Sequence, residues 1–252
     1  MSESEAPETL RVLSSASRTP AARLGVAVVE GLVTAIVSGE LQPGDVLPPE
    51  GPLAQQFGVS RTVLRESIKR VEEKGLVAVA QGRGTRVQPT SSWNMLDRIV
   101  LSALISRDDS LDVLDELTIV RARLESAMAA ATAGRRTDEQ LDRMRAAIDR
   151  MAEVVDDPEA FVPADVAFHE LVMTFSGNRL AESIARILYD RARESRSFNG
   201  EVQEQDLRRT LGEHAAVLTA IEQQNAEAAE RDMEFLITEA WRRRRLPRGV
   251  GA

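Results

Sequence analysis

Apolar residues in the first third of the chain recur every three to four positions in three successive stretches. This is the period of an amphipathic helix, and it predicts helices over residues 24–39, 50–57 and 60–74. Two short apolar runs, 76–80 and 85–87, then flank the glycine-rich turn QGRG, which is typical of a β-hairpin. Three helices followed by a hairpin within residues 24–88 are the elements of a winged helix-turn-helix domain.

The chain beyond the hairpin shows only the helical period. Helices are expected over 93–106, 110–133, 137–155, 158–175, 178–197, 203–223 and 225–244. Ser110 and a Thr137–Gln140 capping box mark two of the starts, and Pro163 is expected to kink or split its helix. The predicted fold is therefore mostly α: a disordered arm (1–23), a winged helix-turn-helix (24–88) and an all-α helical bundle (89–252).

Composition narrows the function classes. The chain of 252 residues has no cysteine, which excludes disulfides and thiolate metal sites. No apolar run approaches the roughly 20 residues of a membrane span, and the N-terminus lacks the pattern of a secretion signal, so we expect a cytoplasmic protein with no membrane partner. The net charge is −8, yet residues 56–88 carry seven Lys or Arg against three Glu. A basic segment joined to an acidic remainder indicates two different tasks in one chain.

The helix predicted over 60–74 has two chemically distinct faces. Leu64, Ile68 and Val71 share one face and are expected to pack into the domain core. Another face carries Arg61, Arg65 and Lys69, with Thr62 close by. A helix that reads the major groove needs this arrangement. A solvated basic face is the alternative, but the basic turn that follows, with Gly82 and Arg83, favours a DNA contact.

The stretch SGELQPGDVLPPEGPLAQQFGVSRTVLRESIKRVEEKGLVAVAQGRGTRV, residues 38–87, resembles the DNA-binding domain of the GntR family of bacterial transcription regulators. The matching motifs are PGxxLPxE, GVSRxxxRE, EKGL and GxGTxV. The resemblance implies that Arg61 and Arg65 contact bases and phosphates, that Thr62 assists, and that Gly82 and Arg83 belong to the wing. One position departs from the family: Gly51 stands where a basic residue often follows the LPxE motif.

The segment DVAFHELV places one of the chain's two histidines in an apolar helix. Asp165 and His169 are four residues apart and therefore share a helix face. The other histidine, His214, lies in a second apolar helical segment. A carboxylate and imidazoles that converge can bind a divalent ion. The alternative is a buried hydrogen-bonded pair between Asp165 and His169.

The second half is similar to the all-helical ligand-binding (FCD) domain of the FadR-type branch of the same family. The similar segments are VRARLESAMAAA, ADVAFHELV, SGNRL, and EHAAVLTAI followed by AEAA. Many members bind a divalent metal such as zinc through one Asp and three His. Asp165, His169 and His214 match three of these positions, and Leu236 falls at the fourth. The resemblance implies either no metal or a three-ligand site completed by water and an effector.

Arg121 is the main candidate for binding that effector. It shares an apolar helical stripe with Leu117, Leu124 and Met128, and a buried arginine must find an anion. That anion is either an internal carboxylate such as Glu125 or an effector carboxylate held bidentately. Arg196 and Arg242 are further candidates. The segment WNMLDRIVLSALI, residues 93–105, is similar to members that respond to sugar acids such as galactonate.

These observations predict a homodimeric transcription regulator, expected to act as a repressor. It should bind an inverted-repeat operator and respond to a small carboxylate, for example an aldonate. Two alternatives remain at this point. One is a DNA-binding protein without metal or effector, and the other is a metal enzyme, since two histidines and one carboxylate also form the facial triad of non-haem iron oxygenases.

Overall fold

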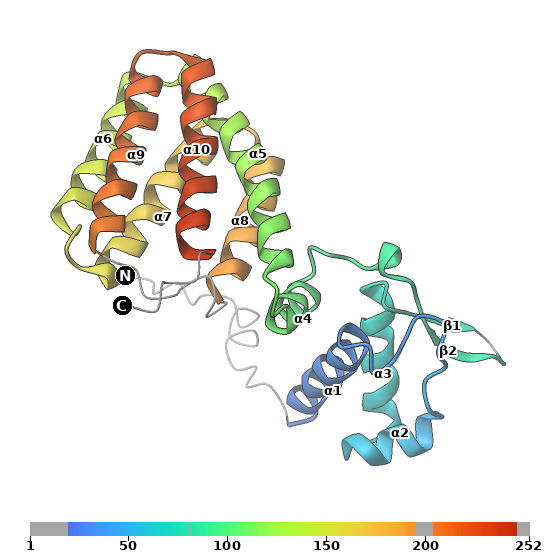
Figure 1. Ribbon diagram of the computed structural model, residues 1–252. Helices are drawn as coiled ribbons and strands as arrows, with labels where there is room; N and C mark the ends of the chain where they lie inside the picture. The colour runs from blue at the N-terminus through green and yellow to red at the C-terminus, as the bar shows by residue number, and fades with distance from the viewer. Residues whose placement is uncertain (1–19, 81, 195–203, 246–252) are drawn as a thin grey trace, which may run out of the picture. The chain divides into compact units, whose positions relative to one another are not determined.

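The computed structural model describes residues 20–80, 82–194 and 204–245 (Figure 1). The chain divides into two compact units, one ending at Ala103 and the other beginning at Leu104. Within the described residues, no helix combines the length and the apolar character that crossing a membrane requires. Each unit is described by itself below.

The first unit contains α1 (Pro20–Val37), α2 (Glu50–Phe57), α3 (Arg61–Glu73), β1 (Val77–Ala80) and β2 (Gly84–Val87). The strands pair antiparallel, with Val77 opposite Val87 and Ala80 opposite Gly84. Helix α3 packs against α1, α2 and β1. The predicted order of helices and hairpin is confirmed. Helix α1 begins four residues before the predicted start, at Pro20, where proline suits the first turn because that position needs no N–H donor.

The segment after the hairpin packs onto the C-terminal end of α3. The backbone N–H of Asn94 donates to the Lys74 carbonyl at 2.9 Å, and Lys74 Nζ lies 2.5 Å from Asp97 Oδ2. Gly75 has φ +78°, and a Cβ there would lie 1.9 Å from the Ser92 carbonyl oxygen. Only a glycine allows the segment to approach this closely. Residues 92–97, here called the docked segment, are therefore held against the helix end.

Helix α4 (Arg98–Arg107) begins later than the sequence predicts. The predicted helix starts at residue 93, but the chain first forms a short 3₁₀ turn, η2 (Thr90–Ser92). Asp97 Oδ1 then accepts the backbone N–H groups of Ile99 and Val100 at 2.9 and 3.2 Å. This carboxylate caps the first turn of α4 and fixes its start.

The second unit is a bundle of six helices that stand side by side in Figure 1. They are α5 (Asp112–Arg135), α6 (Asp138–Glu153), α7 (Pro158–Phe175), α8 (Arg179–Glu194), α9 (Glu204–Glu222) and α10 (Ala226–Arg245). Helix α5 packs against α7, α8, α9 and α10. The main core gathers fully buried side chains such as Phe168, Met144 and Ile221. An all-α bundle is confirmed for this part of the chain.

Two local predictions hold and two do not. The Thr137–Gln140 capping box is present, and Asp157 caps α7 ahead of Pro158. Helix α7 runs unbroken through Pro163, so the predicted split is wrong; this proline lies near the N-terminal end, where it removes one early backbone bond. Ser110 does not cap α5. The N-cap is Leu111, in the left-handed region at φ 66°, while Ser110 Oγ donates to nearby carboxylates.

Candidate functional site

The two faces of α3 lie as the apolar pattern predicts. Leu64, Ile68 and Val71 are buried in the first unit, while Arg61, Thr62 and Arg65 are exposed at the helix N-terminus. Ser60 Oγ accepts the backbone N–H of Val63 at 3.3 Å and so caps the helix. The arrangement presents two guanidinium groups and one hydroxyl at the end of a helix whose opposite face is anchored.

Neighbouring residues constrain these two arginines differently. Arg65 Nε lies 2.7 Å from Glu50 Oε2, but both side chains are largely exposed, 67% and 41%, so the pair contributes little stability. A Cβ at position 51 would lie 3.3 Å from Arg61 Nη2. Gly51, the one departure from the family motif, therefore leaves room for the Arg61 guanidinium.

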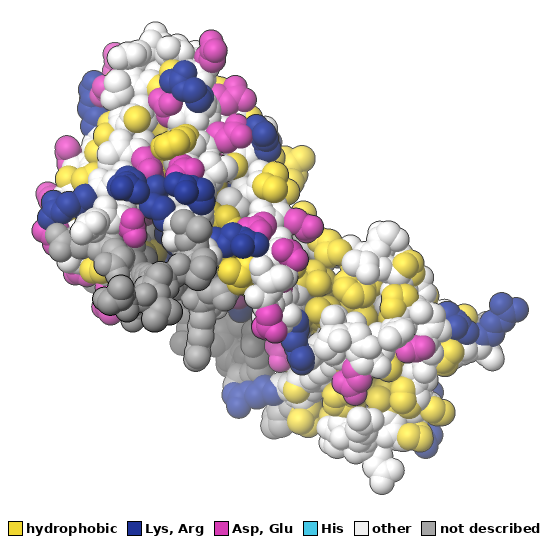
Figure 2. Space-filling view, in the orientation of Figure 1, with side chains coloured by type: hydrophobic (Ala, Val, Ile, Leu, Met, Phe, Trp, Pro, Cys, Tyr) yellow, Lys and Arg dark blue, Asp and Glu magenta, His cyan; other side chains and the backbone are white. Residues whose placement is uncertain are grey.

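The hairpin presents basic side chains at its tip, as Figure 2 shows. Gly82 adopts φ +75°, which permits the tight turn. Arg83 is exposed, and its backbone N–H donates to the Ala80 carbonyl at 2.9 Å. Arg86, also considered from the sequence, donates instead to the Gly44 carbonyl at the base of the hairpin. The first unit thus offers a basic helix end and a basic hairpin.

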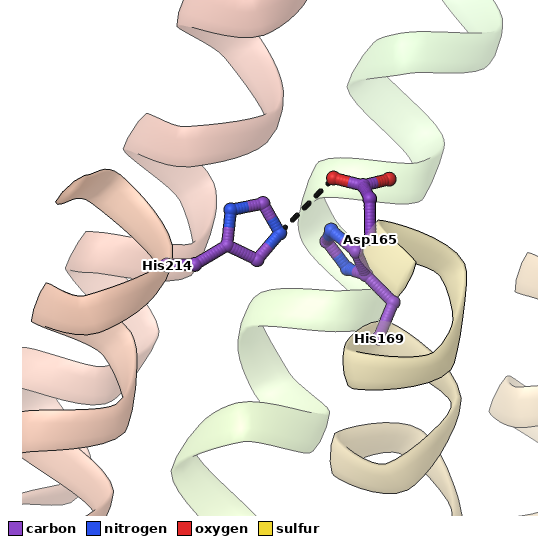
Figure 3. A group of neighbouring side chains, drawn as sticks. All are labelled: Asp165, His169 and His214. Carbon is purple, nitrogen blue, oxygen red and sulfur yellow. Dashed lines mark ion pairs between the residues drawn. The ribbon is translucent and has the colours of Figure 1, made fainter. Parts of the chain in front are cut away.

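In the second unit, Asp165, His169 and His214 converge (Figure 3). Helix α7 presents Asp165 and His169, and α9 presents His214. One potential ligand atom from each residue lies within 4.8 Å of the others. Zinc–ligand bonds of about 2.1 Å allow separations up to ~4.2 Å, so small side-chain rotations would bring the set into range. Both histidines are buried and Asp165 is half-buried.

Each of these three side chains has its own outer partner. His169 Nδ1 lies 2.7 Å from Glu125 Oε2 on α5. His214 Nδ1 lies 2.7 Å from the Thr210 carbonyl, which only accepts, so this nitrogen carries the proton. The Tyr189 hydroxyl donates to Asp165 Oδ2 at 3.0 Å. Partners of this kind orient metal ligands in proteins.

The atoms that face one another in the cluster lack aligned hydrogen bonds. His214 Nε2 lies 3.1 Å from Asp165 Oδ1 (Figure 3), and Nδ1 of His169 faces Glu125, yet neither buried nitrogen has hydrogen-bond geometry. If the proton of His214 is on Nδ1, its Nε2 offers a lone pair toward the carboxylate oxygen of Asp165. Buried polar atoms are nearly always satisfied, so Nε2 of His214 and this oxygen fit as ligands of one cation.

The electrostatics of the cluster keep the carboxylates charged. Burial raises the pKa of Glu125, but Arg121 and His169 outweigh it and bring that pKa down to about 2. Burial also opposes ionisation of Asp165, yet its interactions with His214 and His169 hold its pKa well below the usual range. Burial would lower the pKa of His169, but Glu125 and Asp165 raise it. Two ionised carboxylates beside two imidazoles favour a bound cation.

A cavity of about 30 Å³ opens from this cluster. Its walls are formed by Thr118, Arg121, Asp165, His169, Tyr189, Thr210, Leu236, Ile237, Ala240, Trp241 and Arg244. The volume holds roughly two water molecules. Leu236, at the position of the family's fourth ligand, is 1% exposed and supplies only apolar surface.

Arg121 is buried as predicted and meets the internal one of the two anions that the sequence left open, Glu125. Its Nε lies 2.8 Å from Glu125 Oε1, and the same residue lines the cavity. Its guanidinium carbon also lies 4.2 Å from the centre of the Tyr189 ring. The internal ion pair therefore exists and leaves Arg121 facing the cavity.

The other two predicted effector residues are not in this wall. Arg242 is exposed, and its Nη2 pairs with Glu239 Oε2 at 2.7 Å on the same helix. It turns away because a four-residue arginine run must distribute its side chains around the helix. Arg196 lies outside the described residues.

Three residues of the site were not assigned there from the sequence. Glu125 was considered only as a partner for Arg121, yet it also contacts His169, while the histidine that lies against Asp165 is His214 on another helix. Tyr189 carries no motif, although it is the chain's only tyrosine. Arg244 was taken as part of a solvated helix end.

Comparison with known proteins resolves what kind of chain this is. Residues 24–87 match the model of bacterial regulatory proteins of the gntR family, and residues 116–238 match the FCD domain. The chain belongs to the GntR family. Its members bind DNA operators and small-molecule effectors. The chain is therefore a transcription regulator and not an enzyme, and the metal-enzyme alternative is set aside.

Relatives within the GntR family cover most of the chain. The galactonate operon transcriptional repressor of Escherichia coli K12 is 33% identical over 210 residues, 82% of this chain and 91% of that protein. LutR, a transcriptional regulator of Bacillus subtilis 168, is 31% identical over 79% of this chain and 90% of its own. The solved structure of Lar from Listeria monocytogenes covers 87% of this chain and 97% of that one, with 20% identity and a TM-score of 0.54, which supports the fold.

Proposed function

We propose that this chain is a cytoplasmic, homodimeric repressor whose operator binding is relieved by a small hydroxy acid held at a metal ion. The carrying observation is the Asp165–His169–His214 cluster, in which each potential ligand has an outer partner and Arg121, which can bind an anion, lines the adjoining cavity. The likeness to a galactonate operon repressor supports a sugar acid such as an aldonate as the effector.

Arg61, Thr62 and Arg65 are proposed to read the operator in the major groove. A guanidinium bonds a guanine edge bidentately and discriminates by about 1–3 kcal/mol. Gly82 and Arg83 are proposed to carry the wing to the backbone or the minor groove. A two-fold symmetric dimer would read an inverted repeat, one half-site for each copy.

Asp165, His169 and His214 are proposed to hold a divalent ion such as zinc. The ion would supply a Lewis-acidic centre for oxygen atoms of the effector, while Arg121 donates to the effector carboxylate. With Leu236 at the fourth position, the protein supplies three ligands only. The effector would then complete the site, which makes its binding depend on the metal.

Effector binding is proposed to change operator affinity through a coupling free energy between the two units. Such coupling requires that the effector bind two arrangements of the protein with different affinities. A regulator without metal or effector remains the competing function, since the His214–Asp165 and His169–Glu125 contacts would also stabilise a purely structural cluster.

The deciding experiment combines metal analysis, calorimetry and gel shifts on the full chain. We expect one zinc-class ion per chain, binding of an aldonate to the metal-loaded protein, and release of operator DNA by that acid. Chelation should abolish the release but preserve operator binding. Operator binding that ignores every acid tested, with or without metal, would establish the competing function.

A further inference from the structure

Four consecutive arginines end helix α10, and three of them pair with carboxylates outside the cavity. Arg242 pairs with Glu239, Arg243 with Glu213, and Arg245 with Asp115, each at 2.7 Å. Arg244 is the member of the run that lines the cavity. The four side chains are identical, so the rotation of the helix decides which of them reaches the cavity wall.

Arg244 lies at the mouth of the cavity. Among the described residues that form the walls, it alone is exposed; the others are buried or half-buried. Trp241, one turn earlier on α10, is buried and lines the same cavity. Because an exposed wall residue marks where a cavity meets solvent, the opening lies beside the last turn of α10.

Arg244 interacts electrostatically with the inner wall of the cavity. Burial lowers the pKa of Arg244, while the charge of Asp165 opposes that effect and Arg121 adds to it. Asp165 and Arg121 both line the same cavity. Arg244 is thus exposed at the cavity wall and interacts with its inner charges, as expected of a residue that meets a ligand as it enters.

The cavity is too small to enclose a whole effector, so the two ends of the effector contact different residues. A volume of about 30 Å³ admits an ion and the few atoms that coordinate it. The rest of a longer acid has to extend toward the opening, where Arg244 lies. Arg121 and the Asp165–His169–His214 cluster meet the inner end, and Arg244 meets the outer end.

Given the proposed effector function, we propose that Arg244 binds the end of the effector remote from the cluster, and that the effector carries oxygen acceptors at that end. A guanidinium offers five N–H donors and no acceptor. Hydroxyl groups or a second carboxylate can accept from these donors, whereas an alkyl tail would desolvate the charge and offer no acceptor. The pocket therefore selects polyhydroxy acids or dicarboxylates over aliphatic acids.

The test compares two variants and three acids by calorimetry on the zinc-loaded full chain. Galactonate and 2-hydroxyhexanoate share six carbons, a carboxylate and a 2-hydroxyl, and differ in the outer hydroxyls; galactarate adds a second carboxylate. We expect Arg244→Gln to weaken galactonate binding on the order of 10-fold to 100-fold, the range for a hydrogen bond to a charged group. Wild type should bind 2-hydroxyhexanoate weakly, and Arg244→Gln should bind this acid with the same affinity as wild type. Arg242→Gln, the matched control two positions before Arg244 in the same run, should leave all affinities unchanged.

The outcomes separate this inference from the function on which it rests. If the wild-type chain binds none of the acids, the proposed function fails and the inference with it. If the wild type binds galactonate but Arg244→Gln binds it equally well, only the inference fails. Equal losses for galactonate and 2-hydroxyhexanoate would also overturn it, since Arg244 would then act on the shared end. A larger loss for galactarate than for galactonate supports a second carboxylate as the outer group, and equal losses support hydroxyls.

Discussion

Glu125 on α5 lies 2.7 Å from His169 on α7 through one carboxylate oxygen and 2.8 Å from Arg121 through the other. A single buried carboxylate therefore joins the candidate metal cluster to the candidate effector arginine. It orients the imidazole of His169 and the guanidinium of Arg121 at the same time, so a displacement of one side chain also alters the position of the other.

Replacing Glu125 with Gln should weaken zinc binding about 10-fold to 100-fold, because the outer partner of His169 is lost. Arg121 would also keep a buried charge without its carboxylate, which typically costs about 3–5 kcal/mol of unfolding free energy. Competitive zinc titration and urea unfolding measure the two effects. Glu170→Gln on α7, which removes an exposed pair with Arg186 on α8, is the control. Unchanged zinc affinity would show that Glu125 supports only the fold.

Replacing Leu236 with His should tighten zinc binding on the order of 100-fold, since four-ligand structural sites reach a total of ~10–16 kcal/mol. Leu236 is buried and lines the cavity, so an imidazole there faces the cluster. The same change should weaken effector binding, because the added ligand occupies the position that an acid would use. Zinc titration and calorimetry read out both quantities. Zinc affinity that stays at the wild-type value would contradict the proposed geometry.

Replacing Arg61 with Ala should reduce operator affinity by about 1–3 kcal/mol and relax base preference at one position, as expected for a lost bidentate contact. Arg61 is exposed, so the fold should be unaffected. Arg70→Ala removes the same charge from the other end of α3 and serves as the control. Gel shifts against specific and scrambled DNA separate the two. An Arg61→Ala protein with full specificity would show that α3 is not the reading helix.

Gly75→Ala and Gly39→Ala form a matched pair for the docked segment. Both glycines have positive φ, +78° and +77°, but only a Cβ at Gly75 meets another atom, the Ser92 carbonyl oxygen at 1.9 Å. Gly39→Ala should therefore cost about 1 kcal/mol of backbone strain, and Gly75→Ala clearly more. Urea unfolding of the full chain, followed by a signal from the first unit, compares them. Equal costs would mean that the docked segment moves aside freely.

Stability should depend on pH through Asp115. Arg245 donates to this carboxylate, burial opposes ionisation slightly, and Trp241 adds a hydrogen bond, so the folded-state pKa lies below the ordinary 3.8. A lowered pKa gives stability that is present above the unfolded value and is lost as pH falls through the folded value. The difference in unfolding free energy between wild type and Asp115→Asn should therefore shrink below about pH 4. A difference constant from pH 7 to pH 3 would exclude this role; Asp112→Asn, at an exposed position, is the control.

Local sequence signals were sufficient to predict the secondary-structure elements and the buried face of α3. Helical period, caps and the glycine turn predict most helices, the hairpin and the buried stripe of α3, because each depends on residues close together in the chain. The start of α4 was missed although Asp97 is a local cap, because the residues before it are held against Lys74 and Gly75, and those contacts have no local pattern.

The candidate metal cluster could be predicted only in part from the sequence. Asp165 and His169 share a helix turn, and His214 follows from resemblance, so their convergence could be predicted. The pairings His169–Glu125 and Asp165–His214 join separate helices and depend on how the bundle packs. Arg242 and Arg244 have identical side chains in one run, and only the rotation of α10 decides which one meets the cavity.

The docked segment on α3 has a consequence for genetics. Asn94 and Asp97 contact Lys74, the residue that caps the C-terminus of α3, and Ser92 lies against Gly75, at the end of α3 opposite Arg61. A selection for mutants that no longer repress should therefore return substitutions in residues 92–97 alongside those at the helix N-terminus. These substitutions would lie in the docked segment and not in the proposed DNA-contacting residues. They would nevertheless impair repression, because they change how α3, the helix proposed to read the operator, is held.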